Sequence, residues 1–502
     1  MYSPFKMPSR YFAATALCAA ICLALPAAAQ IGTRFPSEKK IVTDPVTGVP
    51  LTFLTSTPHG DSKIYQTHHQ WTSDGKWVIF RSNRVRGEAM AVNEETGVIV
   101  QVTEGGYSGM LCLADHSMSL YFLRIPMERP ALPMTGAEPA YGAPPSPTTE
   151  TPPTTAPGAR PAGGAAGRGR QTGPAQIMKV DLAKLFADSA AGKMQKADVY
   201  QQVCGTIPLE WGAGGDMALD CTEEWAYFRV GKDEAAKHLP PDTKIESAYG
   251  PRKMGAGPAG LGKMNLKTGE VGFIVAVPFQ VGHVQTNPWM PGEIVFCWET
   301  GGKSPQRTWT VRSDGTGLRP LYPEAPYEWI THEAVITKDE VAIAILAHRR
   351  VKIPGQDNSE NDGPGQGDAW GPSGTGEHPS GLGVVNLRTR EMRIVGQVPM
   401  GNPGRSVWHV NGSPDGRWAV ADDFLYRVWL YDRTNGEMML LADMGHMTTA
   451  ADHIHPTFNA DSNKIEIQSA MLSAGGDKRT LNICVIPVPE AWLKRTYSNK
   501  AP

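Results

Sequence analysis

The chain repeats one strand–turn–strand unit along most of its length, and this repetition restricts the fold more than any other feature of the sequence. The first copy runs from Trp71 to Arg81 and reads WTSDGKWVIFR, with a polar Asp-Gly turn followed by a β-rich run. Asp-Gly and Asn-Gly pairs suit tight hairpins because they tolerate positive φ angles. Further copies begin near Ala114, Asp216, Thr286, Val335, Asn411 and Thr457.

Each copy, together with the β-run that follows it, supplies about four strands, which is one blade of a propeller. A twisted sheet of this size cannot bury both of its faces alone, so such units stack radially and close into a ring. The pattern therefore predicts an all-β, seven-bladed β-propeller. The last copy lacks an outer strand, whereas Pro50 to Thr55 forms an orphan β-run near the N-terminus. We expect this N-terminal strand to complete the last blade and hide its open edge.

The first 29 residues have the features of a cleavable signal peptide. Lys6 and Arg10 form a basic start, an apolar run from Tyr11 to Pro26 follows, and Ala27 to Ala29 supply the small residues that a signal peptidase needs. We therefore divide the chain into a signal peptide, residues 1–29, and a single propeller, residues 30–502. The expected location is periplasmic or secreted, with no attachment to the membrane after cleavage.

Three insertions interrupt the even spacing of the repeats. Residues from about 130 to 173 are rich in Pro, Ala, Gly and Thr, and this composition predicts disorder because it buries too little apolar surface. Residues of about 232–260 and 353–381 are expected to form long loops. All three are expected between the second and third strands of a blade, at the end of the channel where the innermost strands begin.

Charge and cysteine content limit the possible partners and cross-links. The 48 basic and 50 acidic side chains nearly balance, so no large field of one sign points to nucleic acid or an anionic membrane. Five cysteines follow the predicted signal peptide, and an oxidising compartment permits a disulfide. Cys204 and Cys221 are the nearest pair in sequence and are candidates for a bridge. The odd number leaves at least one thiol free.

The histidines recur at a similar offset ahead of several hairpins. That offset places each one near the start of an innermost strand, where the strands converge on the propeller axis. We therefore expect imidazoles from separate blades to face one channel; the alternative is that each only fills the channel as a polar side chain. His453 and His455 alternate on one strand, so both rings can face the axis and bind one ion. The histidines with this offset are His68, His69, His283, His332, His409, His453 and His455.

Three segments together resemble the oligogalacturonate lyases, a family of seven-bladed propeller pectin lyases. They are GHVQ at 282–285 followed by IVFCWE at 294–299, ITHE at 330–333, and HIHPTF at 453–458. The likeness extends over most of the chain outside the insertions. The hairpin SPDG at 413–416 is less specific, because many propellers of the TolB type carry it.

The resemblance implies β-elimination at a uronate, assisted by a divalent metal, Mn²⁺ in this family. It places the metal on His332, His453 and His455, and makes His283 the base that removes the C5 proton. A metal at the uronate carboxylate stabilises the charge that develops there, and an imidazole accepts a proton near neutral pH. We interpret Glu333 as the acceptor that orients His332. The expected substrate contacts are His68, His69, Gln285 and His409.

The sequence departs from the family at two positions. Ala450 stands where the family has a glutamine ligand, so the fourth protein ligand is not identified; Thr448, Asp452, Gln285 or a water molecule are the alternatives. Gly260 stands where the family has a catalytic arginine. Arg252 is the residue that we expect to replace this arginine, with Lys253 and Lys263 as nearby alternatives.

These observations favour a lyase that acts on acidic, oligogalacturonate-like oligosaccharides in pectin degradation. An alternative is a non-catalytic TolB-like propeller that binds protein or glycan, which the two departures would explain. A third possibility is another metal-dependent propeller enzyme, such as a hydrolase or an epimerase.

Overall fold

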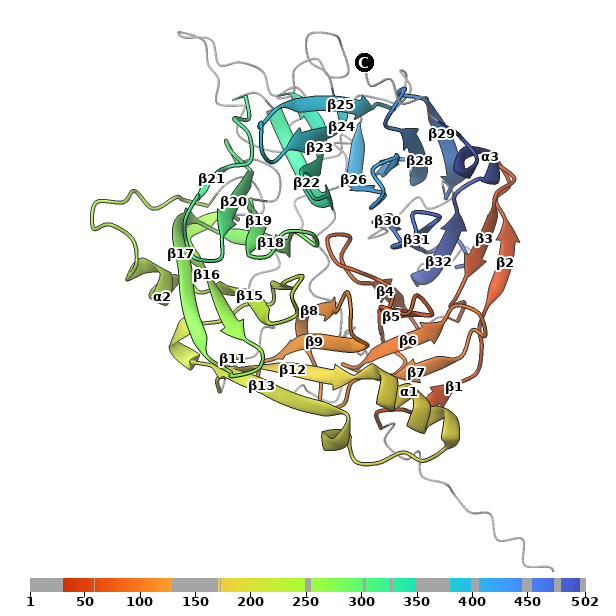
Figure 1. The fold of residues 1–502 in the computed structure, drawn as a ribbon, viewed down its shortest axis with the longest axis horizontal. Coiled ribbons are helices and arrows are strands. Elements are labelled where there is room, and N and C mark those ends of the chain that lie inside the picture. Colours follow the sequence, from red (N-terminus) through yellow and green to blue (C-terminus); the bar gives the residue numbers. More distant parts are fainter. Residues whose placement is uncertain are drawn as a thin grey trace, which may run out of the picture.

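The computed structural model describes residues 30–57, 59–128, 170–171, 173–248, 254–300, 304–325, 328–348, 380–398, 406–444, 454–473 and 480–496. Seven sheets of four or five antiparallel strands surround a central channel (Figure 1). The predicted seven-bladed β-propeller is confirmed.

The first three blades, each given from the channel outwards, are built from consecutive parts of the chain, except that the outermost strand of the first blade comes from the N-terminal segment. Their strands are β4 (Asp61–Lys63), β5 (Trp77–Ser82), β6 (Ala89–Asn93), β7 (Ile99–Gln101) and β1 (Arg34–Phe35); β8 (Ser108–Leu113), β9 (Ser119–Arg124), β12 (Ala175–Asp181) and β13 (Gln201–Ile207); and β14 (Met217–Leu219), β15 (Trp225–Val230), β16 (Ala256–Asn265) and β17 (Val271–Phe279).

The other four blades follow the same plan. Their strands are β18 (Val281–Thr286), β19 (Glu293–Trp298), β20 (Thr308–Arg312) and β21 (Arg319–Pro320); β22 (Glu328–Thr337), β23 (Glu340–His348), β24 (Gly381–Asn386) and β25 (Met392–Gly396); β26 (Val407–Gly412), β27 (Trp418–Asp423), β28 (Arg427–Asp432) and β29 (Met438–Asp443); and β30 (Thr457–Phe458), β31 (Lys464–Ser469), β32 (Asn482–Pro487), β3 (Pro50–Phe53) and β2 (Lys40–Thr43).

The N-terminal segment closes the ring, as the sequence predicts. β3 pairs with β32 through Thr52 opposite Val485 and Phe53 opposite Cys484, and β2 adds a fifth strand outside it. The same segment also supplies β1, which pairs with β7 of the first blade. The N-terminal residues therefore join the first and last blades, so that neither blade depends on its own strands alone.

Short polar turns connect the innermost strand of a blade to the second. In two blades the turn is built alike: Asp74 accepts from the Thr72 hydroxyl and the Lys76 amide, and Asp415 accepts from the Ser413 hydroxyl and the Arg417 amide. The glycines that follow, Gly75 and Gly416, have φ angles of 68° and 77°, which cost a glycine little. The repeated Asp-Gly pairs are thus the local cause of the repeated hairpins.

The hydrophobic core consists of layers between neighbouring blades. Between the sixth and seventh blades, for example, the fully buried Trp418 and Leu430 belong to the same cluster as Ile465 and Ile467. Alternating apolar residues on both faces of each sheet supply these layers, because each blade packs against two neighbours. This packing fixes the innermost strands and therefore the side chains that they carry.

The long connections between second and third strands emerge where the innermost strands begin. Met217, at the start of β14, pairs with Phe228 near the end of β15, and helix α2 (Lys232–Ala236) follows directly. We call this the loop end of the channel, and the opposite end, where the short turns lie, the hairpin end. Two short strands, β10 (Met127–Glu128) and β11 (Arg170–Gln171), pair across the base of the longest insertion. The predicted signal peptide and most of the insertions at 130–173 and 353–381 lie outside the described residues.

Two further structural features bear on the sequence predictions. Each of the five cysteines after residue 29 is free, so the suggested bridge between Cys204 and Cys221 is not formed. The reason is topological: Cys204 lies on β13, the outermost strand of its blade, whereas Cys221 follows β14, the innermost strand of the next. Among the described helices, none has the length and apolar character needed to cross a bilayer.

Candidate functional site

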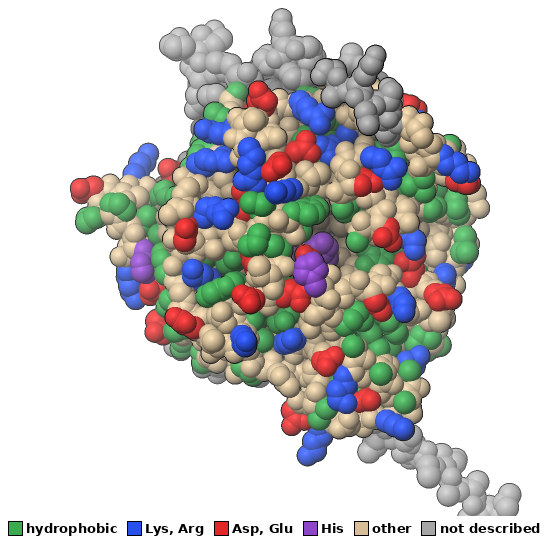
Figure 2. All heavy atoms as spheres, viewed as in Figure 1, with side chains coloured by type: hydrophobic (Ala, Val, Ile, Leu, Met, Phe, Trp, Pro, Cys, Tyr) green, Lys and Arg blue, Asp and Glu red, His purple; other side chains and the backbone are tan. Residues whose placement is uncertain are grey.

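Four imidazoles and one phenol ring from five different blades meet around the channel axis. Their ring centres follow one another at 4.9 Å (Tyr65–His283), 5.8 Å (His283–His332), 4.2 Å (His332–His409), 3.8 Å (His409–His455) and 5.1 Å (His455–Tyr65). We call these five side chains the imidazole circle. The predicted convergence of histidines from separate blades is therefore observed. Histidine side chains also lie beside a hollow at the middle of the face shown in Figure 2.

Three imidazoles of the circle have Nδ1 fixed by an acceptor outside it. His332 Nδ1 donates to the Trp408 carbonyl (2.7 Å), His409 Nδ1 to the Asp422 carboxylate (2.8 Å), and His455 Nδ1 to the Gln66 side-chain carbonyl (2.5 Å). Because these oxygens only accept, Nδ1 carries the proton and Nε2 keeps the lone pair. This is the tautomer of a histidine that binds a metal through Nε2 while its other nitrogen is held by an acceptor.

Asp422 links two members of this set. One of its carboxylate oxygens accepts from the His409 backbone amide (2.6 Å), and the other accepts from both His409 Nδ1 and the His455 backbone amide (3.3 Å). His455 has a positive φ of 52°, as does His283 with 51°. Positive φ is uncommon for residues other than glycine and persists only where the surroundings enforce it. Both histidines are therefore held in place by contacts between blades.

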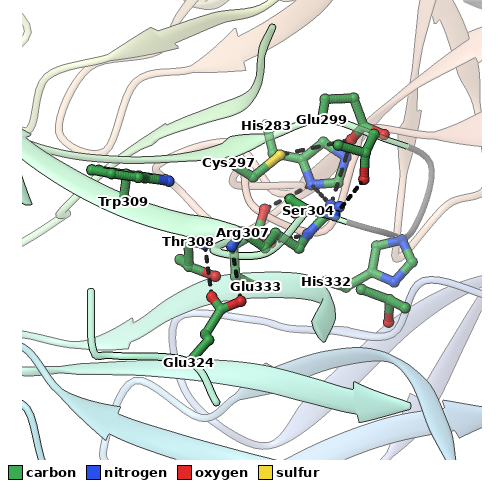
Figure 3. A network of polar contacts seen from close by, with 12 residues as sticks. His283, Cys297, Glu299, Ser304, Arg307, Thr308, Trp309, Glu324, His332 and Glu333 are labelled. Atoms are coloured by element: carbon green, nitrogen blue, oxygen red, sulfur yellow. Dashed lines mark hydrogen bonds and ion pairs between the residues drawn. The ribbon is translucent and has the colours of Figure 1, made fainter. Parts of the chain in front are cut away.

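The fourth imidazole, that of His283 on β18, lies in a cluster of charged groups (Figure 3). Its Nδ1 donates to Glu333 (2.7 Å), and its Nε2 lies 3.3 Å from a Glu299 oxygen. The guanidinium of Arg307 pairs with Glu333 through Nε (3.0 Å) and lies 3.5 Å from Glu299 through Nη2. With His283 protonated, two cations face two carboxylates, so the buried cluster is neutral.

This environment determines the protonation of His283 and Tyr65. Burial opposes the charged form of His283, but the carboxylates of Glu333 and Glu299 outweigh burial and raise the pKa of His283. The hydroxyl of Tyr65 lies 3.4 Å from His283 Nε2. Burial and the nearby carboxylate of Glu333 raise the pKa of Tyr65 well above its usual value, so the hydroxyl keeps its proton. The two groups thus form an imidazole–phenol pair that is able to exchange a proton.

His283, Cys297 and Glu299 also form a possible metal site, because their ligand atoms all lie within 4.8 Å of one another. One feature makes this group a less suitable site for a cation. The Arg307 guanidinium already places a positive charge beside Glu299.

The structure differs from the predicted contacts of two residues. Glu333 was expected to orient His332, but it binds His283 and Arg307, because neighbouring residues on a strand point to opposite sides. Gln285 was expected to contact substrate, yet it is fully buried and its amide bonds to the Glu333 carbonyl and the Val335 amide. The ring of His409 lies between those of His332 and His455, and its contact with substrate stays a prediction.

His68 and His69 lie away from the circle, toward the hairpin end. His68 Nε2 donates to the Met217 carbonyl and Nδ1 accepts from the Thr67 hydroxyl, both at 2.8 Å, and burial lowers the pKa of His68 to about 4. His69 pairs with Asp115 at 2.7 Å, and its side chain is 46% exposed. Both line a cavity of about 30 Å³ with Asp115 and Asp220. The residues that line this cavity include Leu113, Leu219 and Thr286 at the ends of innermost strands, so His68 and His69 lie apart from the circle and their contact with substrate stays a prediction.

Some of the predicted site residues lie outside the described part of the chain, namely Arg252, Lys253, Thr448, Ala450, Asp452 and His453. Lys263 is described, but its ammonium group donates to the Ser313 carbonyl and stacks over Trp225, so it does not replace the family's arginine at the circle. The arginine that does lie beside His283 is Arg307, which sequence reasoning missed.

Sequence reasoning also missed Tyr65, Glu299 and Asp422. Tyr65 had no periodic signal, because the first blade carries His68 at the histidine offset, four residues before Thr72, as His409 stands four before Ser413. Glu299 and Arg307 flank the loop between the second and third strands of the fourth blade, and nothing in the repeat pattern distinguishes them. Asp422 lies on β27, the second strand of its blade, whereas the histidine offset marks only innermost strands.

Two solved structures share this architecture over nearly the whole chain. An oligogalacturonate lyase in complex with manganese has a TM-score of 0.62 at 18% sequence identity, over 93% of this chain and 100% of its own. A second, from Vibrio parahaemolyticus, has a TM-score of 0.59 at 17% identity, over 92% and 100% of the two chains. This propeller has the fold of the oligogalacturonate lyases. No protein-family model and no curated protein sequence matches the chain.

Proposed function

We propose that the protein is a lyase that cleaves uronate-containing oligosaccharides by metal-assisted β-elimination in the imidazole circle. One observation supports this proposal: the imidazole of His283 lies in one circle with three imidazoles whose Nδ1 atoms are each held by an oxygen acceptor. β-Elimination at a uronate needs both functions next to each other, because the base and the carboxylate ligand act on adjacent atoms. The shared fold of the manganese-bound lyase agrees with this assignment.

The residues that would hold the metal are His332, His409 and His455. The outward Nδ1 contacts to a carbonyl, a carboxylate and an amide oxygen fit the pattern of metal-bound histidines. His453 stands two residues before His455, and we propose it as a further ligand from the sequence. Imidazole nitrogens suit divalent transition metals. Mn²⁺ is our first candidate because the lyase of the same fold was solved in complex with manganese. When bound, such an ion stabilises negative charge on the uronate carboxylate and so makes the C5 proton more acidic.

His283 acts as the base in this scheme. Its Nδ1–H is held by Glu333, so Nε2 is the atom that accepts the C5 proton of the sugar. The imidazolium that forms is stabilised by Glu333 and Glu299, which also raise the pKa of His283. A positioned general base of this kind contributes about 10²–10⁴ in rate.

Arg307 positions the base rather than contacting the sugar. It is buried and bonds to Glu333 through Nε, which keeps that carboxylate directed at His283 Nδ1. Its backbone amide and that of Thr308 donate to Glu324, so a second buried carboxylate fixes this part of the chain. Burial raises the pKa of Glu324 to about 7.

We further propose that the substrate is an acidic, uronate-containing oligosaccharide, and that the enzyme works in the periplasm or outside the cell. The predicted signal peptide, residues 1–29, supports export. N-terminal sequencing of the protein recovered from its native host tests this: a start near residue 30 supports cleavage, and an intact Met1 contradicts it.

The activity is tested by incubating the protein with a panel of uronate oligomers and Mn²⁺ while recording the ultraviolet absorbance of the unsaturated uronate product. We expect absorbance to rise with at least one oligomer, to stop on addition of a chelator, and to fall by a factor of about 10²–10⁴ in His283→Ala. His116→Ala, in an exposed hairpin of the second blade, is the matched control and should keep full activity. Flat traces across the panel would contradict the proposal and favour a non-catalytic binding propeller.

A further inference from the structure

Tyr65 places a hydroxyl next to the proposed base. Its Oη lies 3.4 Å from His283 Nε2, and its half-buried ring is held between the rings of His283 and His455, whose centres are 4.9 Å and 5.1 Å away. Its carbonyl accepts from the His68 amide (3.0 Å) and the Gln70 side chain (3.2 Å), which fix the backbone. The hydroxyl is therefore a positioned proton donor at the atom of His283 that faces the sugar.

We propose that Tyr65 protonates the leaving glycosidic oxygen, and that the enzyme is specific for uronates whose C5 hydrogen and C4 oxygen lie on the same face of the ring. This inference rests on the proposed function, because it assigns the acid and the stereochemistry of that reaction. The inference names the substrate class that the site accepts. We expect the enzyme to prefer sugars of the glucuronate configuration over galacturonate.

The distance between the two proton-transferring atoms decides the stereochemistry. A general acid or base must come within about 3 Å of the atom that it serves. Groups that act on opposite faces of a sugar have the ring between them and therefore stand well apart. Tyr65 Oη and His283 Nε2 are only 3.4 Å apart, so both reach the sugar from one side.

The chair forms of the two C4 epimers show which sugar meets this requirement. In glucuronate the axial C5 hydrogen and the equatorial C4 oxygen project toward the same face of the ring. In galacturonate, the epimer at C4, the oxygen is axial and projects toward the opposite face. An elimination in which the base and the acid both act from the same face of the ring therefore suits a glucuronate with a substituent on O4.

His283 and Tyr65 together account for every proton that moves in this reaction. The C5–H bond breaks and its proton goes to His283 Nε2; the bonding electrons form the C4=C5 double bond; the C4–O bond breaks, and its oxygen takes the proton of Tyr65. The resulting tyrosinate then takes the proton from His283 Nε2, 3.4 Å away, and both residues return to their starting state. The products are an unsaturated uronate and an alcohol, and no further reactant is needed.

A pair of 4-O-glycosylated uronates that differ only at C4 tests the inference, assayed with Mn²⁺ by the absorbance of the unsaturated product. We expect cleavage of the glucuronate epimer at a rate at least tenfold above that of the galacturonate epimer. Preferential cleavage of the galacturonate epimer would overturn the inference and leave the proposed lyase function intact. If neither epimer nor any oligomer of the panel is cleaved, the proposed function fails and the inference falls with it.

The role of the hydroxyl is tested separately with Tyr65→Phe, which keeps the ring contacts and removes only the acid. We expect kcat to fall about 10²–10⁴-fold with a sugar leaving group, but much less with a 4-O-nitrophenyl uronate, whose leaving group needs no proton. His283→Ala should lose activity on both. Equal losses on both substrates in Tyr65→Phe would indicate a structural role and overturn the assignment. The matched control is Tyr431→Phe, since the buried Tyr431 hydroxyl has no hydrogen-bond partner among the described residues.

Discussion

At the residue scale, Asp422 is the carboxylate on which two of the proposed metal ligands depend. It fixes the tautomer of His409 and holds the backbone of His455. We expect Asp422→Asn to weaken Mn²⁺ binding about 10–100-fold, as loss of such a supporting acceptor commonly does. Isothermal titration of the protein with Mn²⁺ measures this. Asp415→Asn, in an exposed turn of the same blade, is the control; equal affinities in the two variants would contradict the role of Asp422.

A second prediction at this scale concerns pH. The carboxylates near His283 raise the pKa of the imidazole, and the base acts only when neutral, so activity should rise with pH through this elevated pKa. Glu299→Gln removes one of these negative charges. The acid limb of the kcat/KM profile should therefore move to lower pH, since kcat/KM reports ionisations of the free enzyme. Glu437→Gln, at an exposed ion pair with Arg495, should leave the limb unchanged. A shift to higher pH in Glu299→Gln would refute the assignment of His283.

At the residue scale, the sequence predicted where some side chains lie but not which contacts they make. The common offset of His283, His332, His409 and His455 correctly predicted that their rings converge, because position on an innermost strand follows from the repeat. The offset alone was not sufficient, since His68 and His69 share it and lie toward the hairpin end. The repeat did not indicate which side chains hydrogen-bond to one another. Glu333 bonds to His283 of the preceding blade, and this contact depends on the rotation of one blade against the next. Such lateral contacts are set by packing and leave no periodic signal in a single sequence.

At the element scale, the N-terminal strands determine whether the ring closes. Phe53 on β3 is fully buried in the core of the last blades, whereas Ile41 on the adjacent β2 is 66% exposed. We expect Phe53→Ala to reduce the free energy of unfolding by about 3–5 kcal/mol, in the range for large-to-small core substitutions. Ile41→Ala should change it by no more than about 0.5 kcal/mol. Denaturant unfolding followed by tryptophan fluorescence measures both, and similar values for the two variants would argue against closure through β3.

The elements were largely predictable because a blade repeats its hydrophobic alternation and its turn residues. The orphan run Pro50 to Thr55 was therefore recognisable as the missing strand of the last blade. β1 was not, since Arg34 and Phe35 are too few residues for a period-two pattern. α1 (Leu182–Ala191) also went unpredicted, because it occurs in one blade and is not part of the β-repeat. Asp181 caps its first turn by accepting from the Lys184 amide.

At the scale of the whole molecule, an ion held by three blades should stabilise the closed ring. A ligand that binds only the folded state raises its stability by about 2.7 kcal/mol at a concentration of a hundred times Kd. We therefore expect Mn²⁺ to raise the midpoint of thermal unfolding, and a chelator to reverse the effect. In His409→Ala the rise should be absent or much smaller. An unchanged midpoint in the wild-type protein at saturating Mn²⁺ would contradict binding between the blades.

The central claim is that imidazoles from separate blades bind one divalent ion beside the His283 base. Anomalous diffraction from crystals soaked in Mn²⁺ tests it most directly, because the signal locates the ion without assuming a ligand set. We predict one strong peak within bonding distance of Nε2 of His332, His409 and His455. A peak bound instead by His283, Cys297 and Glu299, or no peak in the channel, would contradict the account.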